Sequence, residues 1–335
     1  MQNVASQNFP RLVGDIGGTN IRLAVIAAAG EAPAQIRSFT CSSFPGPEAA
    51  IHHYLACEGL QLPPVAAFGI ATPLAGDAVR MTNHPWAFSI EALRTALGLR
   101  HLVFINDFTA LALALPRLGG TDLEQIGGGT PQPDAPLALL GAGTGLGVSG
   151  LIPCGAGWQP LAGEGGHVSL AAGNAREAAI IAVLAARFGH VSAERALSGP
   201  GIAALHDAIR QLEGAPPCQL DSREISDRAL AGSCPYCSEA LEVFCALLGS
   251  VAADLALTLG ARGGVYVGGG IVPALGAYFA RSGFRARFEA KGRFSAYLTA
   301  IPTYVIRAPH AALSGAGEAL NRATPAPPMP PEASK

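Results

Sequence analysis

The sequence predicts an α/β protein of two domains, and three observations support this. The chain has 335 residues, which is more than one hydrophobic core usually organises. Short apolar runs alternate with segments of helical spacing, as is typical of sheets covered by helices. A strand, a glycine-rich turn and a second strand are indicated at residues 12–25 and again at 137–152. Aligning Gly14 with Gly141 superposes the two turns, which suggests two related halves.

The individual elements follow from apolar runs and their punctuation by turn residues. Strands are expected at 12–25 (a pair around a turn), 65–72, 101–105, 137–152 (a second pair) and 265–267. Helices are expected at 91–98, 174–188, 238–259 and 313–322. Asn174 and Glu177 fit a capping box at the start of the second of these helices.

The expected domain boundaries follow from the half-repeat and the last helix. A small α/β domain is expected at residues 1–115 plus 308–322, and a large α/β domain at 116–307. Residues 1–10 are interpreted as a loose arm. Residues 323–335 are rich in proline and are expected to be a disordered tail.

Composition argues against several classes of protein. The net charge is −2 and the sequence contains no basic block, so we expect no nucleic-acid partner. The only lysines are Lys291 and Lys335, and no Gly-Lys-Ser/Thr occurs, which excludes a Walker A loop. The uncharged stretch 135–163 contains three prolines and alternating glycines, which indicates strands and turns and no membrane span. Seven scattered cysteines and no apolar leader in the first ten residues favour the cytoplasm.

The first glycine turn, residues 14–20, has the sequence Gly-Asp-Ile-Gly-Gly-Thr-Asn. Its glycines would let backbone N–H groups approach an anion, and the Thr19 hydroxyl could donate to a phosphate. Asp15 at the strand end could hold Mg²⁺ through water. A plain hairpin turn explains the glycines of this segment equally well.

The second glycine turn, residues 141–147, has four glycines in seven residues. We interpret it as a phosphate contact in preference to a purely steric feature. Leu146 breaks the Gly-x-Gly-x-x-Gly pattern, which counts against a dinucleotide-binding Rossmann unit. The glycine run 268–270 follows an apolar strand, and nucleotide contact and packing remain equal alternatives for it.

Asn106 and Asp107 follow the strand expected at 101–105. A carboxylate at the carboxyl end of a strand lies where α/β proteins bind ligands, and it could take a proton from an attacking alcohol. Considered alone, the pair is better explained as an Asx turn that caps a helix at 108–115.

Further polar residues lie next to glycine-rich stretches. Glu164, His167 and Glu194 offer acceptors and donors that suit sugar hydroxyls, although a solvated loop explains each one alone more simply. The glycines between Glu164 and His167 argue against metal-ligand spacing. Cys234 and Cys237 could be half of a zinc site or a redox pair, but no second pair lies at zinc-ribbon spacing, so ordinary cysteines are favoured.

Taken in order, these motifs resemble the bacterial glucokinase family of the actin–hexokinase (ribonuclease H-like) superfamily, over residues 12–320. The segments that carry the resemblance are 14–20, Met81–Ser89 (Met-Thr-Asn-His-Pro-Trp-Ala-Phe-Ser), 105–110, 141–147, 163–167, 192–195, 197–201 and 264–273. The resemblance implies a two-domain actin/hexokinase-like fold with mixed sheets and an interdomain cleft. It also implies ATP-dependent phosphorylation of glucose to glucose 6-phosphate by a cytoplasmic homodimer.

The resemblance also implies roles for individual residues. Asp107 would be the general base toward the sugar 6-hydroxyl, and Asn106, Glu164, His167 and Glu194 would bind other hydroxyls. Nucleotide and metal contacts would come from the three glycine segments: Gly14, Asp15 (Mg²⁺ through water), Gly17, Gly18, Thr19, Asn20, Gly143, Thr144, Gly145, Gly268, Gly269 and Gly270.

Three other functions remain open at this point: a kinase for another hexose, a non-enzymatic sugar sensor, and a kinase that uses polyphosphate. The related repressor–kinase branch carries a Cys-rich zinc motif after its sugar-binding His. No such motif closely follows His167, so the resemblance predicts no structural zinc, and the lack of a helix-turn-helix segment before Leu12 disfavours a repressor.

Overall fold

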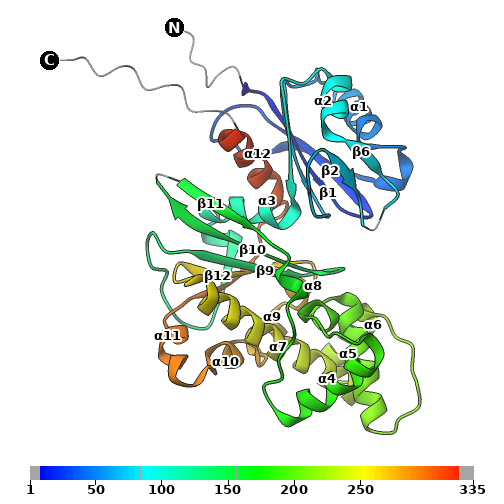
Figure 1. The fold of residues 1–335 in the computed structure, drawn as a ribbon, viewed down its shortest axis with the longest axis vertical. Coiled ribbons are helices and arrows are strands. Elements are labelled where there is room, and N and C mark those ends of the chain that lie inside the picture. The colour runs from blue at the N-terminus through cyan, green and yellow to red at the C-terminus, as the bar shows by residue number, and fades with distance from the viewer. Residues whose placement is uncertain (1–7, 83, 156, 324–335) are drawn as a thin grey trace, which may run out of the picture. The chain divides into compact units, whose positions relative to one another are not determined.

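A computed structural model describes residues 8–82, 84–155 and 157–323. The chain forms two compact units (Figure 1): unit 1 is Met1–Arg117 with His310–Lys335, and unit 2 is Leu118–Pro309. These divisions lie two residues from the boundaries expected at 115/116 and 307/308. Most of the expected N-terminal arm and all but Ala323 of the expected proline-rich tail lie outside the described residues.

Unit 1 is built on a five-stranded mixed sheet with the strand order β3-β2-β1-β4-β7. Strands β1, β4 and β7 are parallel, whereas β2 and β3 are antiparallel to their neighbours. The elements of unit 1 are β1 (Arg11–Ile16), β2 (Asn20–Ile26), β3 (Ala34–Thr40), α1 (Pro47–Glu58), β4 (Val65–Ile70), β5 (Ala78–Arg80), β6 (Ala87–Ser89), α2 (Ile90–Leu97), β7 (His101–Asn106), α3 (Asp107–Ala114) and α12 (Ala311–Ala323).

Helices cover both faces of this sheet, so its central strands are buried on both sides. Leu12 and Ile16 of β1 face a core formed with α1 and α2, while Val13 faces Leu313 and Leu320 of α12 on the other side. Helix α12 lies along α3 (Figure 1), and Gly315 permits the approach, because a Cβ there would lie 1.7 Å from the Ala110 carbonyl oxygen. The last helix of the chain therefore completes the core of the first unit.

Unit 2 contains a six-stranded mixed sheet with the order β11-β10-β9-β12-β13-β8. Strands β9, β12 and β13 are parallel, and the other neighbours are antiparallel. The elements of unit 2 are β8 (Leu123–Ile126), β9 (Leu137–Ala142), β10 (Leu146–Cys154), β11 (Gly157–Ala162), α4 (Ala175–Phe188), α5 (Gly199–Leu212), α6 (Ser222–Leu230), α7 (Pro235–Leu259), β12 (Gly264–Gly269), α8 (Ile271–Leu275), α9 (Ala277–Arg281), α10 (Phe284–Glu289), α11 (Ser295–Thr299) and β13 (Thr303–Ile306).

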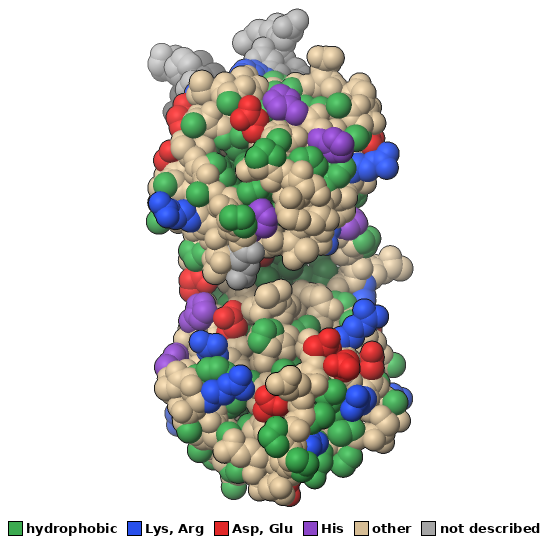
Figure 2. Space-filling model, turned by 90° about the vertical axis from the view of Figure 1, so that its right-hand side faces the viewer, with side chains coloured by type: hydrophobic (Ala, Val, Ile, Leu, Met, Phe, Trp, Pro, Cys, Tyr) green, Lys and Arg blue, Asp and Glu red, His purple; other side chains and the backbone are tan. Residues whose placement is uncertain are grey.

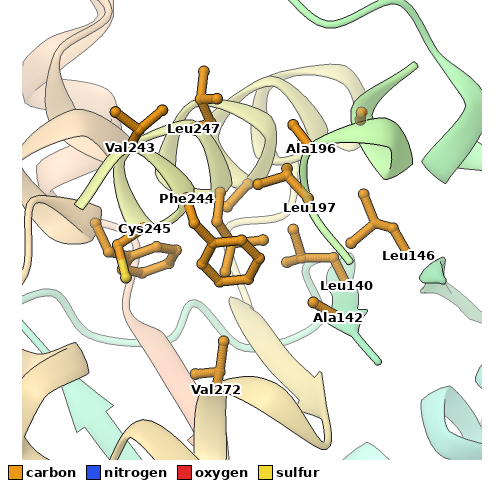
Figure 3. Packing of buried hydrophobic residues seen from close by; sticks show 14 of the residues in the cluster. Leu140, Ala142, Leu146, Ala196, Leu197, Val243, Phe244, Cys245, Leu247 and Val272 are labelled. Atoms are coloured by element: carbon orange, nitrogen blue, oxygen red, sulfur yellow. The ribbon is translucent and has the colours of Figure 1, made fainter. Parts of the chain in front are cut away.

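Helix α7 is the centre of the core of unit 2. It packs against α5, α6, α10 and strand β9, and Figure 3 shows Phe244 close to Leu140 of β9 and Leu197. Among the described residues, α7 is the one helix long and apolar enough to cross a membrane, but 78% of its most apolar window is buried inside the protein. Gly260 ends the helix in a left-handed conformation (φ 62°), as the sequence predicts.

The two sheets share one order of strands, which confirms the half-repeat expected from the glycine turns. In each sheet an antiparallel hairpin is followed by a parallel crossover: β2-β1-β4-β7 in unit 1 and β10-β9-β12-β13 in unit 2. Gly14 faces Phe68 across β1 and β4, and Gly141 faces Gly268 at the equivalent position. The capping box expected for α4 is only half formed. Asn174 accepts from the Glu177 N–H at 2.8 Å, but the Glu177 carboxylate binds Gly173 N and Arg287.

On the face shown in Figure 2, acidic and basic side chains of both units are interspersed with apolar ones. Neither sign of charge forms a continuous field on the face that the figure shows. This mixed surface agrees with the net charge of −2.

Candidate active site

The first glycine turn joins β1 to β2 as a tight hairpin. The Gly17 N–H donates to the Asn20 carbonyl at 2.9 Å, and the Thr19 side chain is exposed at the tip. Gly14 lies inside the sheet, where a Cβ would be 2.4 Å from the Phe68 ring. Packing is thus sufficient to explain Gly14, while the exposed Thr19 remains free to meet a ligand.

Asp15 lies at the end of β1, opposite Arg22 in the hairpin register. Arg22 donates to one carboxylate oxygen, Oδ2, at 2.9 Å. Burial raises the pKa of Asp15 above its usual value, although the charges of Arg22 and His310 act in the opposite direction. The carboxylate is 21% exposed, so it is held in place but still reachable from solvent.

Asn106 and Asp107 lie at the junction of β7 and α3, where Asn106 ends the strand and Asp107 begins the helix. Asn106 is the N-cap of α3: its Oδ1 accepts from the N–H groups of Phe108 at 2.9 Å and Thr109 at 3.3 Å. The Asx turn is therefore formed by Asn106, in a helix that spans Asp107–Ala114 and not 108–115. Asp107 is the first residue of the helix, and its Oδ1 accepts from Phe108 N at 2.9 Å.

The surroundings of Asp107 favour a neutral carboxyl group more than water does. Burial and the negative charge of Asp15 raise its pKa from 3.8 to about 6, despite hydrogen bonds from Phe108 and Asn106. A carboxylate with a pKa just below neutrality is mostly ionised at pH 7 and accepts a proton readily, which is what a general base requires. Gly69 lets β4 approach α3 closely, since a Cβ there would be 3.1 Å from the Ala110 Cβ.

The second glycine turn joins β9 to β10 in unit 2. The Gly143 N–H donates to the Gly145 carbonyl at 2.8 Å, and the Gly143 carbonyl accepts from Gly199 N, at the start of α5, at the same distance. A Cβ on Gly143 would meet nothing within 4 Å, so no neighbour in the protein requires glycine there. That open space fits the close approach of a ligand to the backbone.

Glu194 is attached to this second turn. Its Oε2 accepts from the Leu146 N–H at 2.8 Å, and a Cβ on Gly145 would lie 2.4 Å from the same oxygen. Gly145 therefore makes room for Glu194, and this packing is a sufficient reason for a glycine here even if no phosphate contacts it. The carboxylate holds the turn with one oxygen, and the other can accept from a sugar hydroxyl.

Glu164 precedes a short 3₁₀ helix, Gly165–His167, and His167 is its last residue. The His167 N–H donates to the Glu164 carbonyl at 3.0 Å. Both side chains are exposed. A Cβ on Gly166 would be 2.1 Å from the Leu146 carbonyl, so this segment packs on the start of β10. The Leu146 N–H thus donates to Glu194, while the Glu164–His167 segment packs against the Leu146 carbonyl. These two contacts bring together the sugar-binding candidates of unit 2.

The glycine run at the end of β12 has a largely structural explanation. A Cβ on Gly141 would be 2.5 Å from the backbone of Gly268, and Gly269 (φ 79°) would place a Cβ 2.3 Å from the Ala142 carbonyl. Gly270 is exposed and has open space around its Cα. Packing accounts for Gly269, and Gly268 is buried within β12, so Gly270 is the member of this run with open space for a nucleotide.

Sequence reasoning missed the partners that hold these groups. Arg22 pairs with Asp15. The sequence could have predicted this pair, because a hairpin with a three-residue turn at residues 17–19 places Asp15 opposite Arg22. His310 and the Gly199 N–H carry no comparable signal, because only the tertiary fold brings them close to Asp15 and Gly143, respectively.

Two other features lie apart from the candidate residues described so far. Asn83, in the Met81–Ser89 motif, lies outside the described residues. A cavity of about 380 Å³ beside Arg262 and Thr130 is lined by none of the candidate residues.

Comparisons with known proteins identify the family of the chain. The family model described as Glucokinase matches residues 12–323. A glucokinase of Aromatoleum aromaticum is 63% identical over 324 residues, which cover 96% of this chain and 98% of the relative. One of Chromobacterium violaceum is 57% identical over 92% of this chain and 88% of the relative. The crystal structure of a glucokinase from an Antarctic psychrotroph superposes with a TM-score of 0.86 at 36% identity, over 93% of this chain and 99% of that one. The predicted actin/hexokinase-like fold is confirmed, and the chain belongs to the glucokinase family.

Proposed function

We propose that this chain transfers the γ-phosphoryl group of ATP to the 6-hydroxyl of glucose, with Asp107 as the general base. The observation that carries the proposal is the state of Asp107, a carboxylate fixed at the start of α3 whose pKa is raised to about 6. The high identity to proteins named glucokinase supports glucose as the substrate.

Asp107 acts on the proton of the sugar. As the 6-oxygen bonds to the γ-phosphorus, its proton passes to Asp107 Oδ2, and the bond from phosphorus to the ADP oxygen breaks. Little covalent chemistry is asked of the protein, because phosphoryl transfer depends on alignment and charge neutralisation. Asn106 fixes the position of the base by capping the helix on which it lies.

The carboxylates of unit 1 fit a divalent cation. Asp15 and Asp107 are close enough for the charge of Asp15 to raise the pKa of Asp107, and carboxylate oxygens are preferred ligands of Mg²⁺. Asp15 Oδ2 is engaged by Arg22, so Asp15 would hold the ion through water with its remaining oxygen. Bound Mg²⁺ supplies charge neutralisation at the phosphates. Within the chain, Arg22 keeps Asp15 oriented for this role.

Unit 2 carries the groups proposed for the rest of the sugar and for the nucleotide. Glu194, Glu164 and His167 provide acceptors and donors around Leu146 for the other hydroxyls. For phosphate, the open backbone at Gly143 and the exposed Thr144 are favoured over Gly145, which is occupied by Glu194. Gly270 is favoured over Gly268 and Gly269 for the adenosine. We also infer a cytoplasmic homodimer from family membership, and light scattering on the purified protein tests the dimer.

A coupled assay of ADP release over a panel of sugars tests the proposed function. Glucose with ATP should give the highest kcat/KM, and mannose, fructose and amino sugars should be poorer substrates. Polyphosphate in place of ATP should support little turnover. Turnover equal or greater with another hexose or with polyphosphate would refute the assignment, and absence of turnover with every pair would leave a sugar sensor.

A further inference from the structure

Unit 2 contains a cluster of metal-ligating side chains that the proposed reaction does not use. It consists of His206 on α5 and of Cys234 and Cys237 at the start of α7. One ligand atom from each of these residues lies within 4.8 Å of the others. His206 and Cys237 are fully buried, and Cys234 is half-buried. Cys237 belongs to the core in which α5, α6 and α7 meet, Cys234 packs against it, and His206 is a buried residue of α5.

Among the described residues, neither ring nitrogen of His206 has a hydrogen-bond partner, although the exposure of this side chain is 0%. The Oδ1 atom of Asp207 lies 3.7 Å from Nδ1 of His206, which is longer than a hydrogen bond. Buried polar atoms in proteins are normally paired, so an orphaned imidazole next to two thiols indicates a missing ligand.

We propose that His206, Cys234 and Cys237 bind a zinc ion, with Cys218 as the fourth ligand. Three cysteines and one histidine in a tetrahedral arrangement are a common ligand set of structural zinc sites. The ion would accept a lone pair from His206 and join α5, the loop before α6 and the start of α7. This proposal departs from the prediction of no structural zinc, because sequence spacing revealed only the Cys234–Cys237 pair.

Cys218 is assigned from the loop that carries it. Arg210 of α5 donates from Nε and Nη2 to the Pro216 carbonyl at 3.0 and 2.5 Å. The same guanidinium lies 4.9 Å from the ring centre of Tyr236, between the two clustered cysteines. Arg210 thus holds this loop against the start of α7, close enough for Cys218 to act electrostatically on Cys237.

The surroundings favour the metal-binding forms of His206 and Cys234, but they disfavour the thiolate of Cys237. Burial, together with Arg210 and Arg228, lowers the pKa of His206 against the opposing charge of Asp207, so the ring is neutral at pH 7. Burial acts to raise the pKa of Cys234, but hydrogen bonds from Cys237 and Tyr236 and the charge of Arg210 bring it below its usual value. Burial and the neighbouring Cys234 raise the pKa of Cys237 to about 12, so it would release its proton as metal binds.

A redox disulfide is the competing explanation, since Cys-x-x-Cys at a helix start also occurs in oxidoreductases. A disulfide between Cys234 and Cys237 would leave both nitrogens of His206 without a partner. It would also give Cys218 no role. A metal ion satisfies the three clustered side chains at once and gives Cys218 a role as the fourth ligand, which is why the geometry favours it.

Metal analysis of the full-length protein, purified under reducing conditions without chelators, tests the proposal. Mass spectrometry of elements should find zinc equimolar with the chain. Cys237→Ser and His206→Asn should lose that zinc. Cys245→Ser is the matched control, because it removes a buried thiol from the same helix and should retain the metal. Zinc content unchanged in both cluster variants would overturn the proposal.

A second measurement covers variants that fail to fold. Cobalt added to the wild-type, metal-stripped protein should give the visible absorption of tetrahedral Co²⁺ and a thiolate-to-cobalt charge-transfer band. The Cys218→Ser variant should show a weaker charge-transfer band, and its kinase activity should confirm that it is folded. Absence of the cobalt spectrum in active wild-type protein would refute the site, as would a Cys234–Cys237 disulfide in freshly purified protein.

Discussion

Replacing Asp107 by asparagine should lower activity and raise stability at the same time. The pKa of Asp107 rises from 3.8 to about 6 on folding, so the folded protein disfavours the ionised carboxylate relative to the unfolded chain. At about 1.4 kcal/mol per pKa unit, this lowers the free energy of unfolding by about 3 kcal/mol when Asp107 is ionised. The substituted amide would keep the hydrogen bond to Phe108 N and the Asn106 cap, but not the charge. General-base loss should lower kcat by about 10²- to 10⁴-fold.

The stability gain has a definite dependence on pH. The folded pKa lies above the unfolded one, so the wild type has its full stability below pH 3.8 and loses it as the pH rises through about 6. Urea unfolding of the Asp107→Asn variant should therefore match wild type near pH 4 and exceed it at pH 7. Wild-type kcat/KM should also rise through about pH 6. A variant with nearly normal kcat, or one less stable than wild type at pH 7, would refute this account of Asp107.

Three further predictions concern the phosphate and sugar contacts. Gly143→Val should raise the KM for ATP with little change in melting temperature, because its Cβ meets nothing, whereas Gly145→Ala should displace Glu194 and weaken glucose binding. Equal loss of glucose binding in both variants would make the turn structural. Glucose should raise the melting temperature of wild type and not of Glu194→Ala, and an unchanged shift would remove Glu194 from the sugar site. EDTA should abolish turnover and Mg²⁺ should restore it, so full activity in EDTA would exclude the proposed ion.

The features that depend on local pattern could be predicted from the sequence. Both hairpins, the end of α7 at Gly260 and the end of β7 at Asn106 follow from apolar runs and turn residues that are neighbours in the chain. Those features that depend on tertiary packing could not. Nothing local shows that Gly145 makes room for Glu194, or that Gly268 lies against Gly141, since each partner comes from a distant segment. The environment of Asp107 likewise depends on burial and on Asp15, from another strand.

Helix α12 has a consequence for the order in which the protein can be made. Unit 1 begins the chain, but part of its core consists of Leu313, Ala316 and Leu320 packed on Val13, Val65 and their neighbours. On the ribosome, unit 2 is one continuous segment that can fold as soon as it emerges, while unit 1 must wait with an apolar sheet face uncovered until the last helix is released. A nascent chain interrupted before residue 310 would therefore carry every candidate residue of both units and still present this face to chaperones and proteases.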